Sequence, residues 1–393
     1  MSAEPTAEIL RTLDQIDAET WDGLANPNGR THPSYNPFVT YSFLKALEDT
    51  NCVGEGTGWY PHHVLLKIDD EAVGAVPLYV KMHSQGEYVF DHGWADALER
   101  AGGQYYPKLQ CSVPFTPATG PRLLTAKHEL KPLLAGALAQ VCEQVGTSTL
   151  HATFIGTEDR DAFEEAGYLI RSDQQFHWTD DEYGDFDGFL ASLASRKRKA
   201  IKRERRDALA NNGIEIRWHT GAELTEELWD AFFEFYMDTG SRKWGQPYLT
   251  RSFFSAMGEQ MADDTLLIFA WREGRPVAGA INFIGGDTLF GRNWGCVEHH
   301  PFLHFEVCYY QAIEFALSRG LKRVEAGAQG AHKLARGYLP VETNSAHFIP
   351  HPGFRDAIER FLRQERAAVA RENEMLEQMG PYRKAAPHAG EDA

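Results

Sequence analysis

The order of apolar and polar residues between positions 287 and 348 predicts a strand, a histidine-rich turn, a helix and a second strand. The strands are predicted over 288–295 and 322–327. The helix is predicted over 305–319, where apolar residues recur on one face and Gly320 follows as a left-handed cap. That face consists of Phe305, Cys308, Ala312 and Ala316. The strand ends and the helix start are expected to bring together six polar side chains, namely His304, Glu306, Tyr310, Glu325, Gln329 and Lys333.

Short sequence patterns recur in the same order in the two halves of the chain, which indicates an internal duplication. The paired segments are 19–22 with 227–230, 37–43 with 247–253, 73–75 with 278–280, 88–94 with 288–294, and 167–169 with 337–339. Each copy is predicted to fold as two helices, an antiparallel hairpin, a strand, a helix and further strands. This order predicts an α/β (α+β) fold in which each copy is a mixed sheet flanked by helices. We expect Trp94 to superimpose on Trp294, and Tyr168 on Tyr338.

The first copy is longer than the second between the strand predicted at 88–94 and Gly167. The excess contains several prolines and a glycine around 105–120, so we expect a loop insert near 95–125 instead of a part of the core. An insert in one copy only predicts one functional site instead of two equivalent sites. We expect that site between the copies or under 104–122, on the same side as Glu306 and Lys333.

The chain has 393 residues, which is long enough for two domains. We assign 1–184 to the first copy, 185–212 to a basic connecting helix and 213–350 to the second copy. A charged C-terminal helix is predicted over 351–379, and a disordered tail over 380–393.

The connecting helix carries eight basic residues among the eleven from 196 to 206, whereas the whole chain has a net charge of −17. These residues create a local field that attracts an anionic group such as a phosphate. The predicted contacts are Arg196, Lys197, Arg198 and Lys199. A solvated helix face is the alternative. DNA is not expected as a partner, because the chain is acidic overall and no aromatic residue interrupts the basic run.

The five cysteines are odd in number and show no Cys-x-x-Cys spacing, which argues against a disulfide framework and against a zinc site. The adjacent histidines at 62–63 and 299–300 are poor chelates, so no metal is assigned. The sequence shows no signal pattern and no apolar run of membrane-spanning length. We therefore expect a cytoplasmic protein without a membrane partner. No pattern in the sequence indicates its oligomeric state.

A set of short motifs occupies 195–199, 243–245, 247–250, 304–306, 309–311, 327–333 and 336–338. Together these motifs resemble the FemAB-like predicted N-acyltransferases, a family of the GNAT acetyltransferase superfamily that is named for peptidoglycan biosynthesis or recognition. The resemblance extends from about Trp21 to Phe361. It implies tandem GNAT-like domains, in agreement with the duplication.

GNAT domains that bind acetyl-CoA usually hold its pyrophosphate with the backbone N–H groups of a glycine-containing turn at the start of the central helix. The order of elements places 298–304 at that position, where no glycine occurs and Pro301 removes one donor. This departure argues against acyl-CoA. Aminoacyl-tRNA, as in the related Fem transferases, is the other candidate co-substrate. The expected partner is therefore a phosphate-bearing small molecule or a tRNA-linked donor.

Acyl transfer to an amine needs a base, a donor for the developing oxyanion and an acid for the leaving group. The candidate catalytic residues are Glu306 and His304 as bases, Tyr310 as acid, and Lys333. The first three have structural alternatives, namely a favourable charge at a helix start, a helix cap or a core tyrosine. The candidate substrate-binding residues are Gln329, His332, Arg292, Arg336, Trp244, Tyr106, Lys108 and Arg122, besides the four basic residues of the connecting helix.

The leading functional hypothesis is a cytoplasmic N-acyltransferase or aminoacyltransferase, in which an amine directly attacks an activated acyl group. The polar residues between Glu306 and Lys333 favour this hypothesis. The alternative is a non-catalytic GNAT-like protein that recognises a cell-wall precursor or a protein partner. The missing glycine turn favours the alternative.

Overall fold

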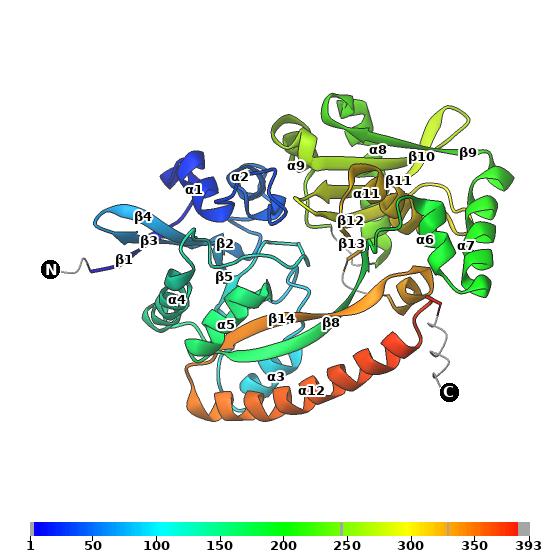
Figure 1. The fold of residues 1–393 in the computed structure, drawn as a ribbon. Helices are drawn as coiled ribbons and strands as arrows, with labels where there is room; N and C mark the ends of the chain where they lie inside the picture. Colours follow the sequence, from blue (N-terminus) through cyan, green and yellow to red (C-terminus); the bar gives the residue numbers. More distant parts are fainter. Residues whose placement is uncertain (1–3, 244–246, 328–329, 384–393) are drawn as a thin grey trace, which may run out of the picture.

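The first half of the chain combines short strands with helices (Figure 1). The computed structural model describes residues 4–243, 247–327 and 330–383. The strands of the first half are β1 (Thr6–Leu10), β2 (Trp59–Pro61), β3 (His63–Ile68), β4 (Glu71–Val76), β5 (Leu78–Lys81), β6 (Lys108–Cys111), β7 (Leu150–Ile155) and β8 (Leu169–Thr179). Its helices are α1 (Ala18–Ala25), α2 (Tyr41–Asp49), α3 (His92–Arg100), α4 (Lys131–Val145) and α5 (Thr157–Glu165).

The second half follows two connecting helices and has a similar order of elements. The connecting helices are α6 (Phe186–Ser192) and α7 (Ser195–Ala208). The strands that follow are β9 (Ile214–Thr220), β10 (Thr265–Arg272), β11 (Arg275–Ile284), β12 (Thr288–Cys296), β13 (Arg323–Glu325) and β14 (Leu339–Phe348). The helices are α8 (Glu226–Lys243), α9 (Arg251–Gln260), α10 (Leu303–Phe305), α11 (Gln311–Arg319) and α12 (Pro352–Gln378).

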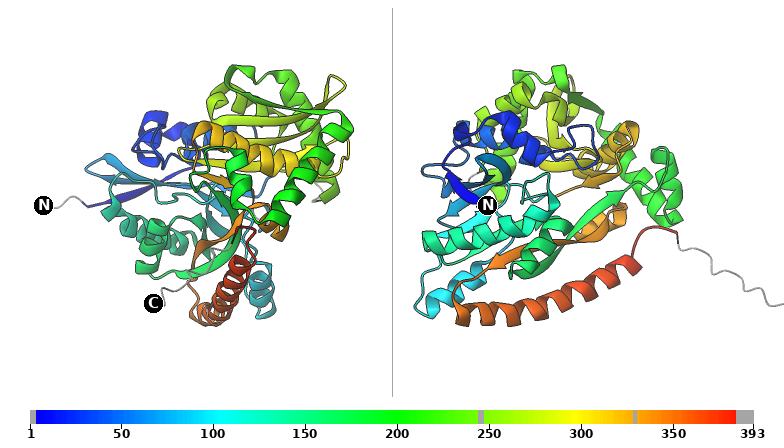
Figure 2. Two further views of the ribbon diagram at one scale, coloured as in Figure 1. Left: turned by 45° about the vertical axis from the view of Figure 1, so that its right-hand side comes forward. Right: turned by 60° about the vertical axis from the view of Figure 1, so that its left-hand side comes forward.

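One large mixed sheet runs through both halves. Within the described residues it has eleven strands, in the order β2-β5-β6-β7-β14-β8-β13-β12-β11-β10-β9. A second sheet contains β1, β3 and β4. The long helix α12 lies beneath β8 and β14, as Figure 1 and the right-hand view of Figure 2 show. The predicted α/β fold, a mixed sheet flanked by helices, is confirmed.

Two helices begin in the same way in the two halves. Thr40 precedes α2, and its side chain accepts a hydrogen bond from the backbone N–H of Phe43. Thr250 precedes α9 and accepts from the N–H of Phe253 in the same manner. A threonine at this position satisfies an N–H group that the helix itself leaves unpaired. Both helix starts therefore lie within the paired segments 37–43 and 247–253.

The halves exchange their last strands. β14 lies between β7 and β8, so the final strand of the second half pairs with the first half. β8 pairs with β13, so the final strand of the first half pairs with the second half. β8 and β14 also pair with each other along most of their lengths, from Leu339 opposite His177 to His347 opposite Leu169. The exchange makes the two half-sheets continuous.

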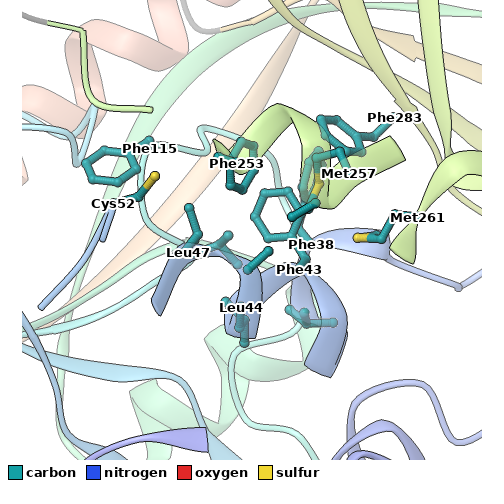
Figure 3. Packing of buried hydrophobic residues seen from close by; sticks show 14 of the residues in the cluster. Phe38, Phe43, Leu44, Leu47, Cys52, Phe115, Phe253, Met257, Met261 and Phe283 are labelled. Atoms are coloured by element: carbon teal, nitrogen blue, oxygen red, sulfur yellow. The ribbon is translucent and has the colours of Figure 1, made fainter. Parts of the chain in front are cut away.

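An apolar cluster also joins the halves on one side of the sheet (Figure 3). Phe43 of α2 and Phe253 of α9 meet edge to face, with 5.7 Å between their ring centroids. Phe283 of β11 packs against Phe43 at 5.5 Å. Aromatic rings contribute large buried areas and favour such edge-to-face contacts. The α2–α9 contact is therefore a core shared by both halves.

A buried charge cluster surrounds Lys108 of β6. The ammonium group of Lys108 donates hydrogen bonds to Glu87, at 2.7 Å, and to Asp91. The hydroxyl of Tyr105 donates to Asp91 at 2.7 Å. Lys108 is completely buried, so these carboxylates supply the compensation that a buried cation requires.

Two buried imidazoles lie next to this charge cluster, one on β7 and one on the exchanged strand β14. Nδ1 of His151 on β7 lies 2.6 Å from Nδ1 of His347 on β14. Burial lowers the pKa of His151 to about 3 and the pKa of His347 well below its ordinary value. The nearby Lys108 and Arg171 cations lower both values further, whereas Asp91 opposes the shift. Both rings are therefore held in the neutral form at neutral pH.

The strand predicted at 88–94 was wrong. Trp94 lies in α3, whereas Trp294 lies in β12, so these two residues do not occupy equivalent elements. The carboxylate of Asp91 turns inward to Lys108, and the chain then enters α3 instead of continuing as a strand. By order of elements, β6 is the counterpart of β12. Tyr168 and Tyr338 do occupy matching places, directly before β8 and β14.

The segment predicted as a loop insert contains part of the core. Strand β6 and most of helix α3 lie within 95–125, and most residues between β6 and Thr125 are buried. Phe115 is 5% exposed and packs in the apolar cluster between the halves, where its ring stacks on Tyr248 at 4.8 Å. The prolines and the glycine of this segment lie in a mostly buried stretch of irregular chain after β6, here called the buried crossing. Such turn-forming residues usually indicate an exposed loop, which is why the prediction was wrong.

We predict that stability falls as the pH drops from about 6.5 towards 3, because the unfolded chain then binds protons that the buried His151 and His347 exclude. Each buried neutral ring should lower the free energy of unfolding by about 1 kcal/mol when the pH falls from 7.5 to 5.5. Urea unfolding at pH 7.5 and 5.5 measures the loss. His347→Asn should reduce this pH dependence, whereas His128→Asn, at an exposed position, should leave it unchanged. Equal pH dependence in all three proteins would contradict the assignment.

Candidate functional site

The parallel strands β12 and β13 part beyond a short paired region. Their pairing covers Thr288–Phe290 and Arg323–Glu325, and β12 then continues to Cys296 with β11 on one side. No described strand pairs with the other side of β12 beyond Phe290. Unpaired N–H and C=O groups on a strand edge can bind an extended ligand. The gap between β12 and the segment after β13 is therefore the candidate site.

The corresponding gap in the first half is closed. β6 and β7 are parallel and pair as far as Cys111 and Ala152. Gly120 then forms a parallel bridge with Ile155 and donates a hydrogen bond to the carbonyl of Phe154. Only one half thus offers an open edge at this place. That the chain has one functional site instead of two equivalent sites stays a prediction.

A pocket of about 220 Å³ lies beside the open edge of β12. Its lining comes from α8, the end of β12, the histidine-rich turn and the start of α10: Thr239, Trp294, Cys296, Glu298, His299, His300, Leu303 and His304. The pocket therefore occupies the turn where the order of elements places the pyrophosphate turn of acetyl-CoA-binding domains. Its volume corresponds to about seven water molecules at 30 Å³ each, enough for a small acyl or aminoacyl group.

The helix after this turn is interrupted by a π-helical turn. α10, the π-helical residues Glu306–Tyr310 and α11 form one continuous helical segment, which Gly320 closes in the left-handed conformation as predicted. Phe302, before α10, has a φ of 64°, which is uncommon for a residue other than glycine. π-helical turns and left-handed residues occur often at functional sites.

Glu306 is held by α7 instead of facing the pocket. Its carboxylate accepts hydrogen bonds from the guanidinium group of Arg205, at 2.9–3.2 Å, and from the amide of Gln311 at 2.8 Å. Arg205 also pairs with Glu314 at 2.9 Å. Burial raises the pKa of Glu306, and Arg205 opposes that shift. Both carboxylate oxygens of Glu306 are occupied by these contacts, so this arrangement does not fit its predicted role as a base.

Tyr310 is engaged in the same way. Its hydroxyl donates a hydrogen bond to Glu204 of α7. Arg336 also donates to Glu204 at 3.0 Å, and its guanidinium group stacks over the ring of Phe305 at 3.4 Å. The hydroxyl proton of Tyr310 is already donated to Glu204, so Tyr310 does not fit the predicted role of acid. Arg336, predicted to bind substrate, instead fastens the turn after β13 to α7.

His304 is the predicted catalytic residue that lines the pocket. Its ring lies 5.3 Å from Trp294 and 5.4 Å from Tyr309, measured between centroids. The hydroxyl of Tyr309 lies 2.8 Å from Nε2 of His332. Burial, followed by the Arg336 and Lys333 charges, lowers the pKa of His332, which favours its neutral form. The pocket wall therefore contains an aromatic group with imidazoles that can accept a proton.

Lys333 lies at the other side of the gap. It is 1% exposed, and its ammonium group donates a hydrogen bond to the carbonyl of Gly327 at 2.8 Å. Burial lowers its pKa to about 8, because a neutral carbonyl compensates the buried charge poorly. Glu325, where the strands part, has its pKa raised to about 7, and burial is again the main cause. Two groups that titrate near neutral pH thus flank the gap.

Other predicted substrate contacts occupy different places. Lys108 and Arg122 are buried, and Arg122 donates hydrogen bonds to the carbonyls of Thr153 and Ala118, so neither is free to bind a substrate. Tyr106 is half-buried and shares a hydrogen bond with Ser84. Trp244 and Gln329 lie outside the described residues.

Arg292 links the halves. One of its terminal nitrogens donates to the carbonyl of Phe115, which belongs to the buried crossing after β6. The residue is half-buried, and burial lowers its pKa. The crossing after β6 therefore reaches the strand that forms the open edge.

α7 has two distinct faces. Its inner face contributes Glu204 and Arg205, which hold the helical segment and the turn beside the gap. Its outer face carries exposed cations at helical spacing: Arg196, Lys199, Arg203 and Arg206. Of the predicted phosphate contacts, Arg196 and Lys199 lie on this outer stripe, whereas Lys197 and Arg198 are half-buried.

Sequence reasoning missed Glu204 and Arg205 as parts of the site. The one signal for them was Glu204, an acidic residue within a run that is otherwise strongly basic. Cys296 was considered only as a member of the cysteine count. No local pattern marks it, because its neighbour His299 approaches it through the turn.

Among the described residues, no three or more His, Cys, Asp or Glu side chains are placed to hold a metal ion. No helix in the described ranges combines the length and the apolar character needed to span a membrane.

Comparisons with known proteins agree with this architecture. The chain is similar to a solved structure of FemX, with a TM-score of 0.53 and 12% identity over 90% of this chain and 100% of that one. It is also similar to L-PGS from Bacillus licheniformis, with a TM-score of 0.50 and 10% identity over 81% and 95%. A conserved protein of unknown function from Bacteroides thetaiotaomicron gives a TM-score of 0.51 and 13% identity over 87% and 99%.

These identities are low, so the likeness shows the fold alone. No curated protein matches the sequence significantly. The FemAB-like family, described as peptidoglycan biosynthesis/recognition, matches residues 12–384. Because the match covers nearly the whole chain, the chain belongs to the FemAB-like family.

Proposed function

We propose that this protein transfers an activated acyl or aminoacyl group to an amine, with the reacting groups in the pocket beside the β12–β13 gap. The observation that carries the proposal is His304 on the wall of this pocket, next to an unpaired strand edge. The edge can align an extended acceptor or donor by backbone hydrogen bonds. The pocket can hold the acyl group that is transferred.

His304 is the proposed base. The amine nitrogen attacks the carbonyl carbon of the activated acyl group, and the imidazole of His304 accepts the proton that the amine loses. The bond to the leaving group then breaks, and the leaving group takes up a proton. A base that lines the pocket is better placed for this step than Glu306, whose carboxylate is occupied by Arg205 and Gln311.

Lys333 is proposed to stabilise the oxyanion that develops on the acyl carbonyl. In its charged form it is a hydrogen-bond donor in a buried site, where such donors stabilise developing charge most effectively. With a pKa of about 8 it is mostly charged at neutral pH. Its position beside the Gly327 carbonyl places it across the gap from β12.

The proposed donor is an aminoacyl-tRNA, with acyl-CoA as the alternative. The turn at the pocket contains no glycine, and Pro301 lacks a backbone N–H, so it is a poor pyrophosphate cradle. The outer stripe of α7 can instead contact a phosphate backbone, whose binding depends on such cations. The same helix holds the site through Glu204 and Arg205.

The proposed acceptor rests on the family description, and the proposed cellular location rests on the cysteines. The family description favours an amine on a peptidoglycan precursor as the acceptor. All five cysteines are free thiols, which is usual in a reducing compartment, so the cytoplasm is the proposed location.

A second candidate function is recognition of a cell-wall precursor or a protein partner without catalysis. The specific observation in its favour is that Glu306 and Tyr310 are completely buried and bonded to α7. In that case the open edge of β12 would bind an extended ligand, and no acyl transfer would occur.

We predict that His304→Ala and Lys333→Ala each lower turnover by about 10²–10⁴-fold, the usual effect of losing a catalytic group, with a small change in KM. Steady-state kinetics with aminoacyl-tRNA or acyl-CoA and a peptidoglycan-precursor amine measures this effect. Lys322→Ala removes an exposed lysine paired with Asp180 and serves as the control. If both site variants bind ligand and the wild type shows no transfer with either donor, the non-catalytic function is correct.

We predict that reversing charge on the outer stripe of α7, as in Arg196→Glu with Lys199→Glu, raises the KM for a tRNA-linked donor and leaves turnover nearly unchanged. The reason is loss of long-range attraction, which salt also screens beyond about 8 Å. KM measured at low and high salt checks this. The matched control, Arg360→Glu with Arg371→Glu on exposed positions of α12, makes the same charge change elsewhere. An equal rise in KM for both pairs would show a general charge effect instead.

A further inference from the structure

Cys296 differs from most of the other cysteines in its surroundings. It ends β12 and lines the pocket, although the residue as a whole is only 6% exposed. Cys111 and Cys142 lie in an apolar core, where burial raises the pKa of each thiol, to about 11 for Cys142. Cys52 is likewise buried in the apolar cluster between the halves.

An imidazole accompanies the Cys296 thiol. Nδ1 of His299 lies 3.6 Å from the sulfur, within reach of a thiol hydrogen bond, and His299 also lines the pocket. A thiol beside an imidazole that can take its proton is the arrangement of an activated cysteine nucleophile.

The turn that carries His299 is fixed in place. Glu298 pairs with Arg275 at 2.5 Å and with Arg272 at 3.2 Å, and both arginines belong to the β10–β11 hairpin. The backbone N–H of Val297 donates to the carbonyl of Val277 at 2.9 Å. These contacts hold His299 near the sulfur, so the pairing does not depend on a loose loop.

We propose that Cys296 is a catalytic nucleophile that carries the acyl group as a thioester between donor and amine. This inference rests on the proposed acyl-transfer function and changes its route, because the sequence alone predicts direct attack by the amine. The substrate class is an activated acyl ester or thioester whose acyl part fits a pocket of about 220 Å³.

The covalent route proceeds in two balanced steps. First, His299 takes the thiol proton, the sulfur of Cys296 attacks the acyl carbonyl, and the donor leaves as an alcohol or thiol after taking that proton. Second, the amine attacks the thioester carbonyl, and the carbon–sulfur bond breaks to release the thiolate. His304 accepts the amine proton, and the thiolate regains a proton. No oxidant or reductant is needed.

The first test uses a small acyl thioester, S-acetyl-N-acetylcysteamine, with the full-length protein. Intact-mass and peptide mass spectrometry should show one acetyl group on Cys296, removable by neutral hydroxylamine and by the amine glycinamide. Cys296→Ala should lose this adduct, whereas Cys308→Ser should retain it. Absence of acetyl on Cys296 in the wild type would overturn the covalent route.

The second test does not depend on a donor or on a Cys296 variant. Iodoacetamide should alkylate Cys296 at pH 6 faster than Cys308, which is half-buried but does not line this pocket. His299→Ala should slow the labelling of Cys296 by about tenfold or more and leave Cys308 unchanged. Equal labelling of both thiols in the wild type would contradict an imidazole-activated nucleophile.

The outcomes separate the route from the function. If Cys296→Ala transfers acyl groups to an amine at the wild-type rate, the thioester route is wrong and the proposed transferase function stands. If the wild type accepts acyl groups from neither the thioester probe nor aminoacyl-tRNA and acyl-CoA, both the route and the transferase function are wrong.

Discussion

The pairing of β8 with β14 is the interaction on which the rest of the structure depends. Because each strand ends one half and completes the sheet of the other, neither half can form its full sheet alone. A sheet edge left open would expose unpaired backbone groups, and the exchange covers these edges from within the same chain. The halves therefore form one body, in which α2 and α9 share an aromatic core and α12 covers the exchanged strands.

This constraint makes the two halves unequal. In the first half, Gly120 forms a bridge with Ile155, and the guanidinium group of Arg122 donates hydrogen bonds to backbone carbonyls on both sides of the closed gap. In the second half, β12 keeps an open edge next to the pocket. The duplicated architecture thus has a single candidate site, because the gap between β6 and β7 in the first half is closed.

The inner face of α7 uses charged side chains to hold the helical segment after the pocket. Glu204 and Arg205 are adjacent in sequence and bind the same helical segment after the pocket, Arg205 at Glu306 and Glu204 at Tyr310. A cation and an anion at neighbouring positions can each compensate a buried partner of opposite charge or a buried donor. The exposed cations of the same helix face solvent, where they are available to an anionic ligand. One helix therefore orders the site and presents the charge proposed to attract the substrate.

The sequence by itself determined the features that short-range interactions control. Thr40 and Thr250 mark helix starts, Gly320 marks a helix end, and the order of apolar segments gives the mixed α/β fold, because caps and periodicity act within a few residues. Only the tertiary structure decided the pairing of Arg205 with Glu306, 101 residues apart, and of His151 with His347, 196 residues apart. The strand exchange brings His151 and His347 together, and the packing of α7 on the helical segment brings Arg205 to Glu306. No local pattern records either choice. The same reason explains why Glu306 was taken for a free base, although the fold buries it against an arginine.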